Sequence, residues 1–202
     1  MGGMGRTGPG GEAASCDTSR QPVSANQRSM AERRAVTITY LRQSQRPRRP
    51  VPAAPAKGAA LLRAVRPPTH FYRYLYRLIG DPHNWVSRRL LSDGEIEAII
   101  HDDDVHIYVL YIDGSPGGFC EFDNRSRNDI EIKFFGLAPE RIGQGWGGFF
   151  LGHCLDLAWS LAPESVMLET CTLDHPAALP MYQRFGFEPF DVRTGEVELL
   201  AD

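Results

Sequence analysis

The sequence predicts a mixed α/β domain built on a central, mostly antiparallel β-sheet with helices on both of its faces. Residues 105–112, 119–122 and 130–137 are β-rich runs separated by short polar turns, which is typical of an antiparallel meander. Apolar residues recur at helical spacing both before and after this meander. A further β-rich run, residues 165–171, lies between two helical segments, so helices and strands alternate in the later part of the chain.

The part of the chain before the meander predicts one strand, one loop and two helices. Residues 35–41 are rich in β-branched side chains and predict the first strand. Proline and arginine dominate residues 42–58, and because proline cannot donate a ladder hydrogen bond, we expect a loop there. Residues 71–101 show helical spacing in two pieces, separated by a Gly-Asp-Pro break. The second piece opens on Ser92 and Glu95, which have the spacing of a capping box.

The part after the meander predicts two helices, a strand between them and a closing hairpin. The helices are expected over residues 147–161 and 176–185. The last β-rich segment, residues 188–200, predicts a hairpin that turns at Thr194 and the glycine after it.

Composition and charge narrow the class of protein. The chain has 202 residues, of which 42% are hydrophobic and 23% charged, as expected for one globular domain with an ordinary core. Its formal net charge is −3, so no global positive field attracts nucleic acid or an anionic membrane. The sequence has no apolar run of about 18 residues and no apolar secretory signal near residue 1. We therefore expect a cytoplasmic protein, a monomer or homodimer, with neither nucleic acid nor membrane as a partner.

Cysteine and histidine spacing gives no indication of a metal site. The four cysteines lie far apart, and the six histidines show no ligand spacing, so no metal is expected. The first residues are rich in glycine and serine and cannot bury much apolar surface. We expect a disordered tail over residues 1–34 and a single folded domain over residues 35–202.

The segment that says most about function is the glycine-rich loop over residues 137–148. Gly143, Gly145 and Gly147 alternate, and they lie between a predicted strand and a predicted helix. Glycines there let backbone N–H groups point at a ligand, and the helix adds its positive end, so the loop predicts a phosphate site. A nucleotide-binding P-loop needs a Gly-Lys pair, which is absent. A dinucleotide fold needs the first strand of a parallel unit, whereas this loop follows an antiparallel meander.

The loop resembles the pyrophosphate loop of the GNAT superfamily of N-acetyltransferases. That family's pattern is Gln/Arg-x-x-Gly-x-Gly/Ala, and Gly145 and Gly147 supply its two glycines. Ile142 stands at the Gln/Arg position, with Arg141 just before it. A second block, Asn-x-x-Ala followed by Tyr and Gly-Phe, is matched at Ala178 and Tyr182 and at the Gly-Phe pair of residues 186–187, with His175 replacing Asn.

The resemblance covers about residues 35–200 and implies acetyl-CoA as the acyl donor. Residues 69–76 and 170–187 look like a bacterial subfamily whose acceptor is not assigned. In the family, the strand before the loop diverges from the strand after it, and the donor lies in the gap. The residues implied to bind the donor are Phe135, Gly136, Leu137, Ala138, Arg141, Ile142, Gly143, Gln144, Gly145, Trp146, Gly147, Gly148, His175, Ala178 and Tyr182.

The resemblance also implies the chemistry, which is transfer of the acetyl group to a primary amine of a small molecule or peptide. Glu131 is the candidate base that takes a proton from the amine, with Glu121 on the neighbouring strand as its rival. Tyr182 is the candidate acid that protonates the leaving thiolate, because a phenol pKa of about 10 lies near that of a thiol. His175 is a second candidate for acid or base. Alternation along residues 130–137 predicts that Glu131 shares a face with Phe135 and Leu137.

The acceptor is expected against the first two helices. The residues expected to contact it are Phe71, Tyr72, Trp85 and Glu121. Aromatic rings there would stack on an amine or on its apolar stem.

Two other functions are compatible with the sequence. The domain would bind acyl-CoA without turnover if the departure at Ile142 and the undecided base reflect a sensor or interaction module. A nucleic-acid binder would use the arginines of residues 42–49, although this class disagrees with the negative net charge.

Overall fold

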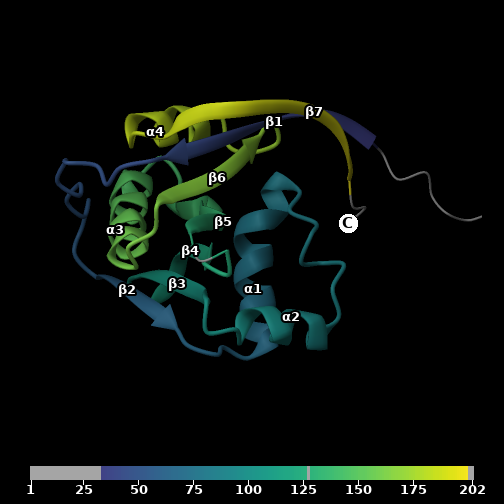
Figure 1. Ribbon diagram of the computed structural model, residues 1–202. Coiled ribbons are helices and arrows are strands. Elements are labelled where there is room, and N and C mark those ends of the chain that lie inside the picture. The colour runs from purple at the N-terminus through teal and green to yellow at the C-terminus, as the bar shows by residue number, and fades with distance from the viewer. Residues whose placement is uncertain (1–32, 127, 200–202) are drawn as a thin grey trace, which may run out of the picture. The chain divides into compact units, whose positions relative to one another are not determined.

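The protein is described from a computed structural model that places residues 33–126 and 128–199 (Figure 1). The strands are β1 (Arg33–Gln43), β2 (Ala59–Ala64), β3 (Val105–Ile112), β4 (Ser115–Asp123), β5 (Asp129–Leu137), β6 (Ser165–Cys171) and β7 (Glu188–Glu198). The helices are α1 (Thr69–Gly80), α2 (Asp93–Ile100), α3 (Trp146–Ser160) and α4 (Ala178–Arg184), with short 3-10 turns η1 (Asp81–His83) and η2 (Pro139–Arg141). The predicted tail lies outside the described residues, except that β1 begins two residues before the predicted boundary.

The described strands form one seven-stranded sheet in the order β2-β3-β4-β5-β6-β1-β7. Neighbouring strands are antiparallel except for β5 and β6, which run parallel. This confirms the predicted mixed α/β class and the mostly antiparallel sheet. The predicted meander is β3-β4-β5. Its first turn is the predicted Asp-Gly pair, where Asp113 and Gly114 have φ angles of 53° and 80°.

The N-terminal strand lies inside the C-terminal half of the sheet. One edge of β1 pairs with β6 and its other edge pairs with β7. The predicted closing hairpin is wrong, because β7 is one continuous strand in which Thr194 lies opposite Thr37. The sequence around the Thr-Gly pair suggested a turn, but the long free edge of β1 offers an extended partner that satisfies the backbone of both strands.

Strand β2 was not predicted. Its sequence, AALLRA, has no β-branched residue and looks helical by propensity. The strand forms because β3 offers an edge, and Ala59 to Ala64 pair with it antiparallel. Tertiary pairing therefore overrides a weak local preference.

The two faces of the sheet carry separate hydrophobic cores. Figure 1 shows α1 and α2 on one side of the sheet and α3 on the other. On the first side, Tyr72, Leu75 and Ile79 of α1 recur at helical spacing and are buried. On the second side, Phe150 and Leu151 of α3 pack in the other core. The capping box predicted at the start of α2 is present, with Ser92 N–H donating to Glu95 Oε2 at 2.8 Å.

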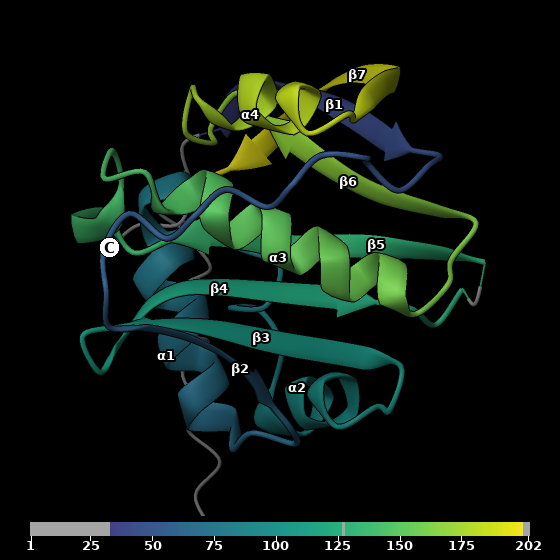
Figure 2. The same ribbon diagram turned by 90° about the vertical axis from the view of Figure 1, so that its left-hand side faces the viewer.

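The predicted Pro/Arg loop crosses the outer surface of α3 (Figure 2). Residues 44–58 contain no helix or strand, which confirms the prediction. Gly152 of α3 makes the crossing possible, because a Cβ there would lie 2.9 Å from Val51 Cγ1. Arg46 forms an ion pair of 2.8 Å with Asp156, and the Arg49 guanidinium stacks 3.6 Å from the centre of the Phe185 ring. Two of the loop's arginines are thus engaged within the molecule.

Candidate active site

The parallel pair β5 and β6 forms a fork. The two strands pair from Asp129 opposite Ser165 to Ile132 opposite Leu168, and the pairing then ends. Figure 2 shows them close together at their beginnings and well apart at their ends. Strand β5 stays paired with β4 as far as Leu137. Its other edge has no strand partner among the described residues beyond the fork, so backbone N–H and C=O groups are available to a ligand there.

A pocket of about 500 Å³ opens within this fork. It is lined by the ends of β5 and β6, by the segment after α1, by the glycine loop and by α4. The residues that line it include Trp85, Ser87, Lys133, Phe134, Phe135, Gly136, Leu137, Ile142, Gly143, Gly147, Glu169, Asp174, His175, Ala178 and Tyr182. A pocket of this volume is large enough for the reactive arm of a cofactor together with a small acceptor.

The glycine loop leads from the fork into α3. Gly143 and Gly145 have φ angles of +77° and +87°, which a side chain would strain. Gly145 is the N-cap of α3, and no side chain caps this end of the helix. The N–H groups of the first turn therefore remain free to bind an anion, supported by the positive end of a 15-residue helix.

The structure brings many, but not all, of the predicted donor-binding residues to the pocket. Nine of the fifteen line it. Ala138 and Trp146 are buried in the fold beside the loop. The Arg141 guanidinium, next to the departure from the family pattern at Ile142, lies 3.6 Å from the Asp113 carboxylate. Gln144 donates to the Glu140 carbonyl oxygen at 2.5 Å. Gly145 and Gly148 face the Pro/Arg loop, with Pro55 and Pro52 as neighbours.

Tyr182 of α4 lies in the wall of the pocket. Its side chain is 6% exposed and packs edge-on against Phe135 of β5 and Phe187, with ring centres 6.3 and 6.1 Å apart. Its phenol makes no hydrogen bond with any described residue. Burial, followed by the negative charge of Asp174, raises the pKa of Tyr182 well above its ordinary value. The phenol therefore stays protonated at physiological pH, as a proton donor must.

A bulge in β5 changes the predicted placement of Glu131. Glu121 of β4 lies opposite Phe134, whereas its neighbour Phe122 lies opposite Ile132, so Lys133 is the extra residue. The bulge reverses the alternation, and the prediction that Glu131 shares a face with Phe135 and Leu137 is wrong. Ile132 and Phe135 pack in the core beneath α3, and Phe134 packs on the α1 side.

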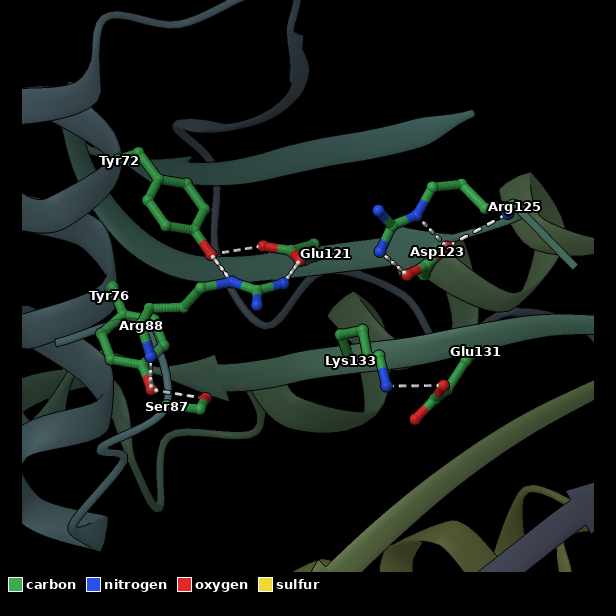
Figure 3. A network of polar contacts seen from close by, with 9 residues as sticks. All are labelled: Tyr72, Tyr76, Ser87, Arg88, Glu121, Asp123, Arg125, Glu131 and Lys133. Carbon is green, nitrogen blue, oxygen red and sulfur yellow. Dashed lines mark hydrogen bonds and ion pairs between the residues drawn. The ribbon is translucent and has the colours of Figure 1, made fainter. Parts of the chain in front are cut away.

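Glu131 forms an ion pair with Lys133 across this bulge. The Lys133 Nζ to Glu131 Oε2 distance is 2.7 Å, and both side chains are about one third exposed. Lys133 lines the pocket, whereas Glu131 is not among the lining residues. Figure 3 shows the pair on β5 beside the buried polar network of β4.

Glu121, the rival base, belongs to a buried polar network with Tyr72 and Arg88 (Figure 3). Tyr72 Oη donates to Glu121 Oε2 at 2.5 Å, and Arg88 Nη2 lies 2.7 Å from Glu121 Oε1. Tyr72 and Glu121 are both fully buried and do not line the pocket. Burial, followed by the charge of Glu121, raises the pKa of Tyr72 well above its ordinary value. Both residues thus have partners within the fold and lie outside the pocket lining.

Residues 70–187 match the model of the acetyltransferase (GNAT) family. The chain belongs to this family.

Solved structures agree with this GNAT assignment at the level of the fold. A functionally unknown conserved protein from Staphylococcus epidermidis is 16% identical, with a TM-score of 0.57, and the match covers 81% of this chain and 61% of that one. An aminoglycoside acetyltransferase from an uncultured soil metagenomic sample is 13% identical, with a TM-score of 0.52, over 63% of this chain and 87% of that one. A GCN5-related N-acetyltransferase from Sphaerobacter thermophilus is 16% identical, with a TM-score of 0.57, and the match covers 83% of this chain and 54% of that one. No curated protein sequence matches the chain.

Aromatic side chains form the α1 side of the pocket in this GNAT domain. Trp85 and Tyr76 line it, and their ring centres lie 5.6 Å apart. Both rings pack against Phe134, at 5.1 and 5.0 Å. Trp85 was predicted to contact an acceptor. Phe71, also predicted there, packs in the core under α1 and does not line the pocket.

Several polar pocket residues escaped the sequence analysis, and Ser87, Asp174 and Glu169 are among them. Ser87 follows the tryptophan in the segment after α1, and its Oγ lies 3.2 Å from Tyr76 Oη. Asp174 accepts hydrogen bonds from Thr170 Oγ1 at 2.7 Å and from a backbone N–H. Glu169 was visible as the lone acidic residue in the apolar run SVMLETC, but that signal gave no indication that the strand borders a fork.

Within the two described ranges, no helix is long and apolar enough to cross a membrane. Within the same ranges, no group of three or more His, Cys, Asp or Glu side chains is placed to hold a metal ion.

Proposed function

We propose that this GNAT domain is an N-acetyltransferase that moves the acetyl group of acetyl-CoA to a primary amine by direct attack in a ternary complex. The observation that carries the proposal is the coincidence of three features at one pocket: a free edge of β5, an uncapped helix N-terminus behind a glycine loop, and the unpaired phenol of Tyr182.

The residues of this pocket fit the donor. The pyrophosphate would lie on the backbone N–H groups of residues 143–148, at the positive end of α3. The amide groups of the pantetheine arm would pair with the β5 edge at Phe135 to Leu137, in the way that an extended peptide adds to a sheet edge. This would direct the thioester into the fork, where Tyr182 lines the wall.

The side chains of the site would then move two protons. A carboxylate at the fork accepts a proton from the acceptor's ammonium group, and the neutral nitrogen forms a bond to the thioester carbon. As the carbon–sulfur bond breaks, the Tyr182 phenol donates its proton to the departing sulfur, and the second proton that the nitrogen loses restores the phenol. Holding both reactants in one pocket supplies much of the rate by proximity. The candidate bases are carboxylates on β5 and β6, and Glu131 is one of them.

The second candidate function is an acyl-CoA-binding module without turnover. Ile142 favours it, because this pocket residue replaces the polar side chain of the family pattern and Arg141 is held by Asp113.

The three described cysteines are unpaired, which agrees with a reducing compartment, so we include a cytoplasmic location in the proposal.

A CoA-release assay with spermidine, sisomicin, L-lysine and a peptide with a free N-terminus tests the proposal. Sisomicin is included because the soil acetyltransferase with the same fold was solved in complex with it. Amine-dependent release of CoA supports the acetyltransferase. Calorimetric binding of acetyl-CoA without release for any amine favours the binding module.

A further inference from the structure

Glu169 occupies the branch point of the fork. Leu168, the residue before it, is the last residue of β6 that pairs with β5, so Glu169 is the first beyond the pairing. Side chains alternate along a strand, which places Glu169 on the same face as Met167, and Met167 lies opposite Glu131. Glu169 and Glu131 therefore lie on the same side of the sheet, on either side of the opening fork.

The other carboxylates near the pocket already have partners. Asp174 accepts from Thr170 Oγ1 and from a backbone N–H, and Glu131 is paired with Lys133. Glu121 is buried, is paired with Arg88 and does not line the pocket. Glu169 lines the pocket and makes no hydrogen bond or ion pair with any described residue. Its carboxylate is thus available to a ligand.

Charged groups on β5 and in the segment after β6 act on Glu169. Glu169 is exposed within the open pocket, and the partial desolvation of its carboxylate there raises its pKa. The charge of Glu131 raises it further, Lys133 opposes these effects, and Asp174 adds to them. On β1, Tyr40 lies directly opposite Glu169.

Two arginines contact residues that neighbour Glu169. Arg42 of β1 contacts the Met167 sulfur at 3.4 Å, and the Arg193 guanidinium of β7 lies 5.0 Å from the centre of the Tyr40 ring. Both cations are thus engaged with the two neighbours of Glu169 and not with its carboxylate.

We propose that Glu169 holds the acceptor's ammonium group in the fork and takes the proton that this group loses before attack, with Glu131 and Lys133 as positioning residues. The inference rests on the proposed acetyltransferase function. Because Glu131 and Lys133 neutralise each other, the three side chains together carry one net negative charge, that of Glu169. This charge balances the single positive charge of one ammonium group. The protons balance in three transfers. The ammonium nitrogen loses one proton to a Glu169 oxygen before attack, and it loses its second proton to the Tyr182 phenolate after that phenol has protonated the departing sulfur. Water removes the proton from Glu169 after the acetylated product leaves.

The first test compares three glutamate-to-glutamine variants with the amine that the wild type acetylates fastest among spermidine, sisomicin, L-lysine and the peptide. Glu169→Gln should bind acetyl-CoA normally but lose about 10²-fold in kcat near neutral pH, since glutamine cannot accept a proton. The loss in kcat should shrink as the pH approaches the pKa of the free amine. Glu164→Gln, at an exposed position just before β6, is the matched control and should retain wild-type kcat.

Glu131→Gln distinguishes the positioning role from the base. Loss of its charge should lower the pKa of Glu169, so the acidic limb of kcat/KM should move to lower pH while kcat stays within a few-fold of wild type. Loss of kcat in Glu131→Gln with full kcat in Glu169→Gln would overturn the proposal and make Glu131 the base.

The second test does not depend on turnover. Carbon-13 NMR of glutamate-labelled protein, with the Glu169 resonance assigned from Glu169→Gln, follows the carboxyl through a pH titration. We expect a pKa above the ordinary value of about 4.3 and a decrease in Glu131→Gln. A Glu169 that titrates at its ordinary value and does not respond to Glu131→Gln overturns the proposal. If the wild type releases no CoA with any amine, the acetyltransferase function fails, and this titration still decides the state of Glu169.

Discussion

Arg88 Nη2 lies 2.7 Å from Glu121 Oε1 in an ion pair whose side chains are 13% and 1% exposed. The same arginine donates from Nε to Tyr72 Oη at 3.1 Å, and its backbone N–H donates to Tyr76 Oη at 3.3 Å. Arg88 directly follows the pocket residue Ser87. The buried pair therefore fastens the segment that forms the α1 side of the pocket to the sheet.

We predict that Glu121→Gln destabilises the fold by about 3 kcal/mol, because it leaves a buried guanidinium without its counter-charge. Urea denaturation measures this, with Glu164→Gln as the exposed control. The double variant Arg88→Met with Glu121→Leu should recover most of the loss, since both charges are then gone. Equal stability of Glu121→Gln and wild type would show that the pair is not important to the fold.

The glycine loop gives a prediction about donor binding. Gly145→Glu should abolish acetyl-CoA binding in calorimetry, because a side chain and a negative charge would occupy the N-terminus of α3. Gly114→Glu is the matched control: its φ of +80° imposes similar backbone strain in the β3–β4 turn, away from the loop. A folded Gly145→Glu protein with wild-type affinity would remove the loop from the donor site.

Tyr182 gives a prediction about the leaving group. Tyr182→Phe keeps the packing of the ring but removes the proton donor, so kcat should fall by about 10²-fold while acetyl-CoA affinity holds. Since the pKa of Tyr182 is raised, wild-type kcat should show no alkaline decline from this group up to about pH 10. Tyr74→Phe, at a half-exposed position on α1, is the control. Wild-type kcat in Tyr182→Phe, with chemistry shown to limit the rate, would leave the phenol a packing residue.

His106 gives a prediction about acid stability. Its ring is 7% exposed, and its Nδ1 is buried without a partner. Burial, followed by the charge of Arg63, lowers the pKa of His106 below its usual 6.5. The unfolded state then binds more protons below about pH 6.5, so this histidine makes stability fall as the pH falls from there. His106→Phe should flatten the dependence of the melting temperature on pH between about 6.5 and 5, whereas exposed His70→Asn should not. An unchanged slope in His106→Phe would assign the acid sensitivity to other groups.

Local signals in the sequence were enough to predict most elements and the glycine loop. The Asp-Gly turn, the capping box and the alternating glycines each depend on neighbours within a few residues, and all are present in the structure. The continuous strand β7, the strand β2 and the place of β1 between β6 and β7 depend on which edge of the sheet is open. No local pattern carries that information.

The candidate site was likewise predictable only where its residues belong to a local sequence pattern. Tyr182 was located by its spacing to the Gly-Phe pair, and it does line the pocket. Glu169 was missed, because its importance comes from the end of the β5–β6 pairing and not from its neighbours in sequence. The bulge at Lys133 is likewise a property of the β4–β5 register, so simple alternation placed Glu131 on the wrong face relative to Phe135.

The most direct test of the central claim is to follow an isotopically labelled acetyl group. Wild-type protein is incubated with acetyl-labelled acetyl-CoA and each amine of the panel, and the amine fraction is analysed by mass spectrometry beside Gly145→Glu and Tyr182→Phe. We predict label on the nitrogen of at least one amine with the wild type, none above background with Gly145→Glu, and slow accumulation with Tyr182→Phe. Tight binding of acetyl-CoA by the wild type with no labelled amine from any member of the panel would contradict the account.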